Sequence, residues 1–127
     1  MTRALRLVWL AALAAVIASS VLPGQSAAMR LIDRAGINDK VEHFTAYAVL
    51  AALPTLGPFR CRRLRATIAF LFLLGALLEL AQLFSPGRTC DWRDLLADSC
   101  GIFAGVVLVR ISRLAFRLHF TPAPPAN

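Results

Sequence analysis

The sequence predicts an all-α fold, a polytopic membrane bundle of about four transmembrane helices with the N-terminus and the C-terminus in the cytoplasm. Hydrophobic residues make up 58% of the chain and charged residues only 17%, whereas soluble domains average about 45–50% and about 25%. The apolar residues gather in four runs, and the basic residues are divided unequally between the two sets of loops and ends. We therefore expect a single transmembrane domain over residues 1–120, multi-pass in a bacterial plasma or inner membrane.

The four apolar runs cover residues 7–22, 41–56, 66–84 and 95–109. A Pro-Gly or Gly-Pro pair follows each of the first three runs, and Arg110 follows the fourth. A helix needs about 20 mainly apolar residues to cross a bilayer, with a range of about 17–25. Only the third run is comfortably long, so we expect flanking polar residues to extend the other helices into the headgroup region. The Pro-rich residues 121–127 are expected to be disordered.

The first run also fits a secretory signal peptide. Arg3 and Arg6 would form its basic segment, residues 7–18 its apolar segment, and residues 26–28 a cleavage site of small residues. In this alternative the mature chain begins near Met29 and three spans remain. The Pro-Gly pair after the run suits cleavage, but it equally suits the end of a helix, and we favour a retained first helix.

The basic residues predict the orientation. One side holds nine of them: Arg3, Arg6, Arg60, Arg62, Arg63, Arg65, Arg110, Arg113 and Arg117. The other side holds five: Arg30, Arg34, Lys40, Arg88 and Arg93. Because cytoplasmic loops carry an excess of Lys and Arg, the side with nine is predicted to be inside. The net charge of +7 does not predict a nucleic acid partner, because the charges separate apolar runs and form no soluble basic face.

Residues 110–120 place three of these arginines at helical spacing. They form either the end of the last helix with ordinary cytoplasmic anchors, which we favour, or a segment that lies along anionic inner-leaflet lipid.

The acidic residues are concentrated on the side opposite to the basic excess. All seven lie in an outer loop or in the outer half of a helix: Asp33, Asp39, Glu42, Glu79, Asp91, Asp94 and Asp98. Acidic residues contribute little to orientation, so we interpret their concentration as the sign of a site.

Helical spacing places polar residues of three helices at a similar shallow depth. His43 and Tyr47 are four residues apart and share a face, and Glu79 and Gln82 are three apart and share another. Ionisable groups at this depth usually face the bundle and find partners. The candidate polar pocket comprises Asp39, Lys40, His43, Tyr47, Glu79, Gln82, Arg88, Asp94 and Asp98. Three glycines on the same faces are predicted to pack helices: Gly75, Gly101 and Gly105.

Most of these residues also have a simpler structural interpretation. Asp39 and Asp94 stand where helix caps occur. The Tyr47 hydroxyl and the Gln82 amide suit interhelical hydrogen bonds, and Gly101 and Gly105 suit close packing of helices. A lone histidine such as His43 is more often packed than a ligand. Glu79 and Asp98 are the hardest to explain in this way, because both should lie within the edge of the hydrocarbon.

Three ordered motifs resemble one known family. They are Asp39-Lys40-x-x-His43-Phe44-x-x-Tyr47, then Glu79-x-x-Gln82-x-Phe84-x-Pro86-Gly87-Arg88, then Trp92-x-Asp94-x-x-Ala97-Asp98-x-x-Gly101-x-x-x-Gly105. This set resembles the VanZ-like family of small multi-helix membrane proteins, named after an accessory protein of teicoplanin resistance. The resemblance covers residues 39–105. It departs at Asp98, where the family more usually shows Asn, and it does not imply that this protein confers resistance.

The leading functional hypothesis is a non-enzymatic membrane protein that binds an envelope lipid, a headgroup or a partner protein through an outward polar pocket. Arg88 would meet an anionic group, and His43, Glu79 and Asp98 would complete the pocket. One alternative is an intramembrane enzyme acting on a lipid-linked substrate, with His43 as general base or acid, Glu79 as its partner and Arg88 as an anion clamp. Another is a proton-coupled transporter that uses Glu79 and Asp98.

No cofactor or metal is expected from the sequence. It contains no nucleophile elbow, phosphate loop or metal-spaced histidine pair. Cys61, Cys90 and Cys100 form no CxxC pair, so we expect free thiols. The expected partners are membrane lipids, together with an envelope lipid-linked ligand or a membrane protein, and the sequence is compatible with a homo-oligomer.

Overall fold

The computed structural model describes residues 1–127 apart from 24–25, 27–35, 37, 58–60, 88–89 and 121–127. The described residues form four α-helices and no strand, which confirms the predicted all-α class. The helices are α1 (Arg3–Val21), α3 (Asp39–Thr55), α4 (Cys61–Gln82) and α5 (Trp92–Phe120). The expectation for residues 121–127 lies outside the described residues.

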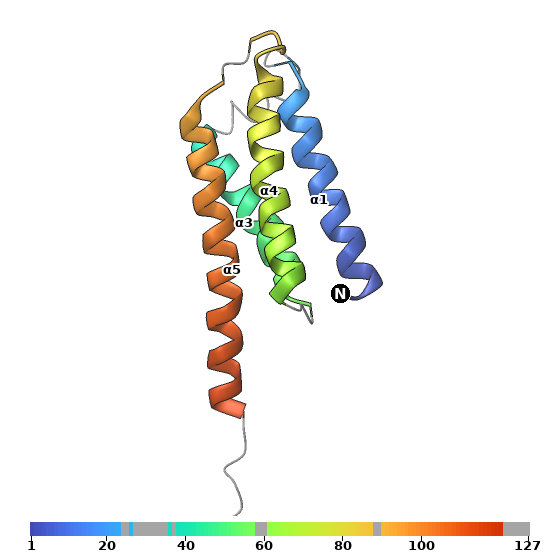
Figure 1. Ribbon diagram of the computed structural model, residues 1–127, viewed down its shortest axis with the longest axis vertical. Coiled ribbons are helices and arrows are strands. Elements are labelled where there is room, and N and C mark those ends of the chain that lie inside the picture. The colour runs from blue at the N-terminus through green and yellow to red at the C-terminus, as the bar shows by residue number, and fades with distance from the viewer. Residues whose placement is uncertain (24–25, 27–35, 37, 58–60, 88–89, 121–127) are drawn as a thin grey trace, which may run out of the picture.

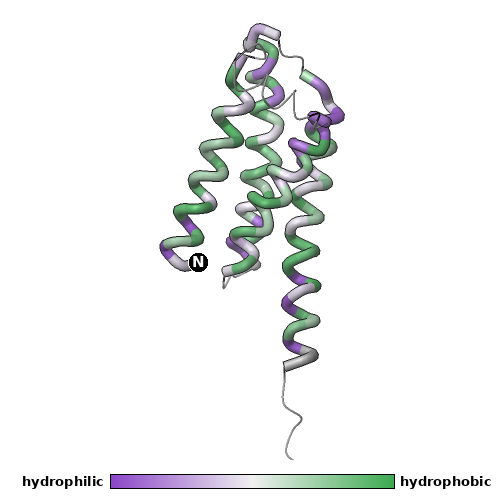
Figure 2. Tube along the Cα trace, turned by 180° about the vertical axis from the view of Figure 1, so that it is seen from behind, coloured by the Kyte–Doolittle hydropathy of each residue, from purple (hydrophilic) through white to green (hydrophobic). Residues whose placement is uncertain are grey.

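Successive helices run in opposite directions, so the chain passes up, down, up and down through the bundle (Figure 1). The start of α1 and the end of α5 therefore lie at the same end of the molecule. Hydrophobic residues dominate the middle of the helices, while hydrophilic residues gather toward their ends (Figure 2). This is the pattern expected of a bundle whose middle contacts lipid rather than water.

Three segments are long and apolar enough to cross a membrane: Arg3–Val21, Arg62–Gln82 and Trp92–Arg117. Helix α3 has 17 residues and spans about 26 Å at the usual rise, a little less than the hydrocarbon core of about 30 Å. Its first residues are also charged. The chain is thus a helical membrane protein, and the crossing by α3 remains a prediction.

At the end of the bundle that carries the N-terminus, α4 and α5 extend beyond their apolar runs. Helix α4 includes Arg62, Arg63 and Arg65, and α5 continues straight to Phe120 (Figure 1). Arginine is a good helix former, so the backbone stays helical where the apolar run stops. Arg113 in the last part of α5 also connects this helix to the end of α3. It donates to the carbonyl oxygens of Leu56 and Gly57, the latter at 3.2 Å.

The closest helix pair is α3 with α5. A Cβ atom added at Gly101 would lie 2.2 Å from the carbonyl oxygen of Phe44, and one added at Gly105 would lie 2.2 Å from that of Ala48. The two backbones therefore touch along this line, as small residues at four-residue spacing allow in membranes. The contact continues into a buried core whose members include Tyr47, Leu50, Ala51, Leu71, Ile102 and Val106.

Helix α1 lies on the outside of this core and contacts it through Trp9. The indole nitrogen of Trp9 donates to the carbonyl oxygen of Leu50 at 2.9 Å, and its ring lies 6.4 Å from that of Phe70 between centroids. At the opposite end the hydroxyl of Ser85 donates to the carbonyl of Val21 at 3.3 Å. These specific contacts support α1 as a member of the bundle, and the intact mass of the purified protein tests whether it is retained.

We predict that Arg62 and Asn127 face the cytoplasm and that Arg34 and Thr89 face outward, because of the nine-to-five division of basic residues. Of these four positions, only Arg62 lies in the described part of the chain. Single cysteines at the four positions, in a background without the native cysteines, are to be labelled with a membrane-impermeant thiol reagent on intact cells. We expect labelling at positions 34 and 89 only. Labelling of position 62 from outside would reverse the orientation.

Candidate functional site

The two helices that begin at the site, α3 and α5, each start with a polar capping residue. The side chain of Asn38 accepts a hydrogen bond from the backbone N–H of Lys40 at 2.9 Å and caps α3. The carboxylate of Asp91 accepts from the backbone N–H of Arg93 at 2.9 Å at the start of α5. The interpretation of Asp39 and Asp94 as the caps is therefore wrong, because their neighbours already bind the free N–H groups. The two carboxylates are available for tertiary contacts.

Lys40 joins the starts of α3 and α5. Its ammonium donates to Asp91 Oδ2 at 2.9 Å and also to Asp94 Oδ1, and it lies 3.9 Å from Asp39 Oδ2. The hydrogen bond from the backbone of Arg93, followed by the bond from Lys40, lowers the pKa of the Asp91 carboxyl below its usual value. One cation thus lies among three carboxylates contributed by two helices.

One helical turn deeper, His43 and Asp98 form a second pair between the same helices. Nδ1 of His43 lies 2.9 Å from Asp98 Oδ1, and only 3% of the Asp98 side chain is exposed. With Asp98 ionised, its carboxylate can only accept, and Nδ1 of His43 would carry the proton in this pair. The second ring nitrogen, Nε2, is directed toward Asp39, whose Oδ1 is 4.0 Å away.

Gly75 brings the third helix to this pair. A Cβ atom at this position would lie 2.8 Å from Asp98 Oδ2 and 3.3 Å from the hydroxyl oxygen of Tyr47. The carboxylate from α5 and the phenol from α3 therefore lie against the bare backbone of α4. A glycine is needed at this point because any side chain would displace the two polar groups.

Glu79, also on α4, is the most unusual of the buried acids. It is only 5% exposed, and its Oε2 accepts from the backbone N–H of Asp91 at 3.1 Å. Its Oε1 and the hydroxyl of Tyr47 are buried without a hydrogen-bond partner among the residues that the structure describes. An unpartnered buried polar atom costs about 1–3 kcal/mol, so two such atoms beside one cluster point to a missing ligand or water.

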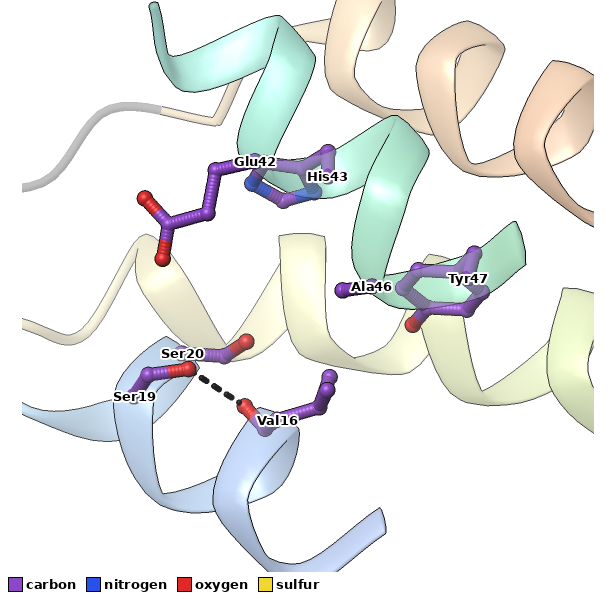
Figure 3. Close-up of a pocket in the computed structure, with 7 residues that line it drawn as sticks. All are labelled: Val16, Ser19, Ser20, Glu42, His43, Ala46 and Tyr47. Carbon is purple, nitrogen blue, oxygen red and sulfur yellow. Dashed lines mark hydrogen bonds between the residues drawn. The ribbon is translucent and has the colours of Figure 1, made fainter. Parts of the chain in front are cut away.

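A small cavity of about 30 Å³ lies next to these groups, between α1 and α3. Its lining consists of Val16, Ser19, Ser20, Glu42, His43, Ala46 and Tyr47. The space suffices for about two water molecules. Figure 3 shows that the Glu42 carboxylate and the Tyr47 hydroxyl lie on the side of α3 that faces the two serines of α1, whose Ser19 hydroxyl donates to the carbonyl of Val16 at 3.0 Å.

A comparison of the sequence with protein families shows to which family the chain belongs. The profile of the VanZ/LLP1 family matches residues 4–113, which include α1, α3, α4 and most of α5. The chain belongs to the VanZ/LLP1 family. This confirms the resemblance that the three sequence motifs indicate and extends it to α1. No curated protein and no solved structure matches the chain.

In this VanZ/LLP1 protein the structure brings together seven of the nine residues predicted to form the pocket. Asp39, Lys40, His43 and Tyr47 come from α3, Glu79 from α4, and Asp94 and Asp98 from α5. Gln82 is 3% exposed and lies one turn beyond Glu79. The ninth, Arg88, lies outside the described residues, so its contact with an anionic group stays a prediction. The cation that the described residues place in the site is Lys40.

Asp91 is a site residue that the sequence interpretation does not include. Its carboxylate caps α5 and binds Lys40, and its backbone binds Glu79. The segment Asp91-Trp92-Arg93-Asp94 has the spacing of a capping box, a cap residue followed three positions later by an acid. This signal places the cap at Asp91, but the Asp91 N–H binds Glu79 rather than Asp94, whose carboxylate accepts from Lys40.

Proposed function

We propose that this VanZ/LLP1 protein binds the polar headgroup of an envelope lipid at the end of the bundle that carries the acidic cluster. The observation that carries the proposal is the pair of buried oxygens that are unpartnered among the described residues, Glu79 Oε1 and the Tyr47 hydroxyl; of these two residues, Tyr47 lines the polar cavity. Such groups are retained where a ligand pairs with them, because an apolar residue in their place would cost less.

The position of the cluster favours a lipid headgroup over a soluble ligand. Polar groups of three helices meet within about two turns of the helix ends, which is the depth at which headgroups meet the hydrocarbon. An apolar groove of about 520 Å³ also runs along α3 and α5 below the cluster, and its lining includes Phe44, Ala48, Ala104 and Leu108. We propose that this end faces outward, as the basic residues indicate.

A second candidate function, an intramembrane enzyme, is favoured by one specific contact. Asp98 binds Nδ1 of His43 and leaves Nε2 directed toward the cluster, as the aspartate does in acid–base pairs that orient a catalytic histidine. His43 would then act as the general base or acid on a lipid-linked substrate. Glu79 and Asp98 as proton carriers of a transporter remain the third alternative.

We predict that Tyr47→Phe weakens ligand binding and leaves folding intact. Its hydroxyl has no partner in the described chain, so its loss breaks no known contact and removes a desolvation cost. If a headgroup pairs with the hydroxyl, one lost hydrogen bond of about 1.4 kcal/mol weakens binding about tenfold. Wild type and variant are extracted into nanodiscs with native lipids, delipidated stepwise and compared by native mass spectrometry. We expect the wild type to retain one lipid mass longer than the variant.

The matched control is Val41→Ala, a change on an exposed face of the same helix, which should retain lipid as the wild type does. Equal retention by wild type, Tyr47→Phe and control would contradict the proposal. Lipid extracts incubated with the wild type separate binding from catalysis, because an enzyme converts one lipid species into another in many-fold excess over protein. A binding protein leaves the composition of the extract unchanged.

A further inference from the structure

A triad of metal-ligand type lies at the mouth of the site. Asp39, His43 and Asp94 each direct one ligand atom toward the others, and these atoms lie within 4.8 Å of one another. Two of them belong to one face of α3 at four-residue spacing, and the third comes from the first turn of α5. The α3–α5 glycine contact fixes this arrangement, because it sets the distance between the two helices.

We propose that Asp39, His43 and Asp94 bind one divalent first-row transition-metal ion, such as zinc. One imidazole nitrogen and two carboxylate oxygens suit zinc or manganese, whereas magnesium and calcium prefer oxygen alone. Two ligand atoms of a tetrahedral zinc ion with bonds of about 2.1 Å lie about 3.4 Å apart, so the three side chains must draw together when the ion binds. Asp39 is half exposed at the start of its helix, which leaves its side chain room to turn toward the ion.

The partner of His43 supports this assignment. A metal-bound histidine usually donates its other ring N–H to a carboxylate, which fixes the ring and the tautomer. Asp98 takes this position at 2.9 Å from Nδ1 and leaves Nε2 free to face Asp39. Asp98 is thus a positioning residue for the proposed ion, held in place against Gly75.

Glu79 gives an observation independent of the triad. Its carboxylate lies at the start of α5, since Oε2 binds the backbone N–H of Asp91, next to the pair of Lys40 with Asp94. The other oxygen belongs to a residue that is only 5% exposed and has no partner within the described segments. A divalent ion in place of the lysine ammonium beside Asp94 would carry twice its positive charge near this buried carboxylate.

Lys40 occupies the position of that cation in the structure. Its ammonium binds Asp94 and Asp91, and its side chain is 37% exposed, so it can turn to water when the ion binds. Lys40 and the ion therefore compete for Asp94. This competition predicts that removal of the lysine strengthens metal binding, and the loss of binding in His43→Gln then distinguishes a built site from unspecific binding to acidic groups.

The test uses the full chain in detergent without a polyhistidine tag and without added lipid, so that it does not depend on the proposed headgroup. Zinc binding is measured by competition with a chromogenic chelator, and cobalt binding by its visible absorption. We expect one ion per chain in the wild type, loss of binding in His43→Gln, and at least about tenfold tighter binding in Lys40→Met. His119→Gln, which removes the other histidine of the chain in the last turn of α5, should bind as the wild type does.

Folding is checked by thermal unfolding of each variant, and added zinc should raise the unfolding temperature of the wild type and of Lys40→Met but not of His43→Gln. No stoichiometric zinc or cobalt binding by the folded wild type would overturn the proposal. Equal affinities of wild type and folded His43→Gln would also overturn it and assign the binding to surface carboxylates only. If His43→Gln fails to fold, Asp39→Asn takes its place, with the same expected loss.

Discussion

The double substitution Gly101→Ala with Gly105→Ala is expected to separate α3 from α5 and to unfold the half of the bundle that carries the acidic cluster. Each added methyl group would lie 2.2 Å from a backbone carbonyl oxygen of α3, and a backbone atom cannot turn aside as a flexible side chain does. Overpacking of this kind costs about 1–3 kcal/mol per site. Alanine gains about 1 kcal/mol over glycine in helix propensity, so the net effect remains destabilising.

The measurement is thermal unfolding in detergent, or steric-trap unfolding in bilayers, of the double variant and of each single variant. A matched control is Ala76→Val, which adds bulk on an exposed face of α4 and should leave the unfolding free energy within about 0.5 kcal/mol. Zinc binding by the proposed triad offers a second readout. It should be lost in the double variant, because Asp94 and His43 lie on the two helices that move apart. A stable double variant with unchanged distances between α3 and α5 would show that the close contact is not required.

The sequence predicts the helices well because their signals are local. Apolar runs bounded by Pro-Gly pairs locate four helices, and the three motifs by themselves indicate the family. The spacing of Asp94, Asp98, Gly101 and Gly105 correctly indicates one face of α5, since helical spacing depends on no other part of the chain. The end of α5 at Phe120 is harder to predict, because a helix can continue past the apolar residues that reveal it.

The partners within the site cannot be predicted in the same way. Lys40 is one of several cations in the sequence, and its choice of Asp91 and Asp94 depends on contacts across more than 50 residues of sequence. The predicted caps lie one residue late at α3 and three late at α5, which hides the position of Asp39 beside His43 and the contact of Asp94 with Lys40. A triad with one ligand from a distant helix follows no sequence motif, so a search for metal-spaced histidines cannot reveal it.

The last prediction concerns the buried pair of His43 and Asp98. His43→Ala leaves the Asp98 carboxylate, 3% exposed, without its partner, and stranding one member of a buried pair costs about 3–5 kcal/mol. Asp98→Ala removes the acceptor of the His43 N–H and should also be strongly destabilising. In the double variant neither group is stranded, so its loss of unfolding free energy should fall short of the sum of the single losses by about 1–3 kcal/mol.

Asp98→Asn is the matched control for this cycle, because the amide oxygen still accepts from His43 at almost unchanged volume. Its unfolding free energy should lie within about 1 kcal/mol of the wild type, a typical value for one hydrogen bond. Additive single effects in the cycle, measured by steric-trap unfolding, would mean that His43 and Asp98 contribute independently. The site would then consist of the Lys40 cluster alone, without a second pair beneath it.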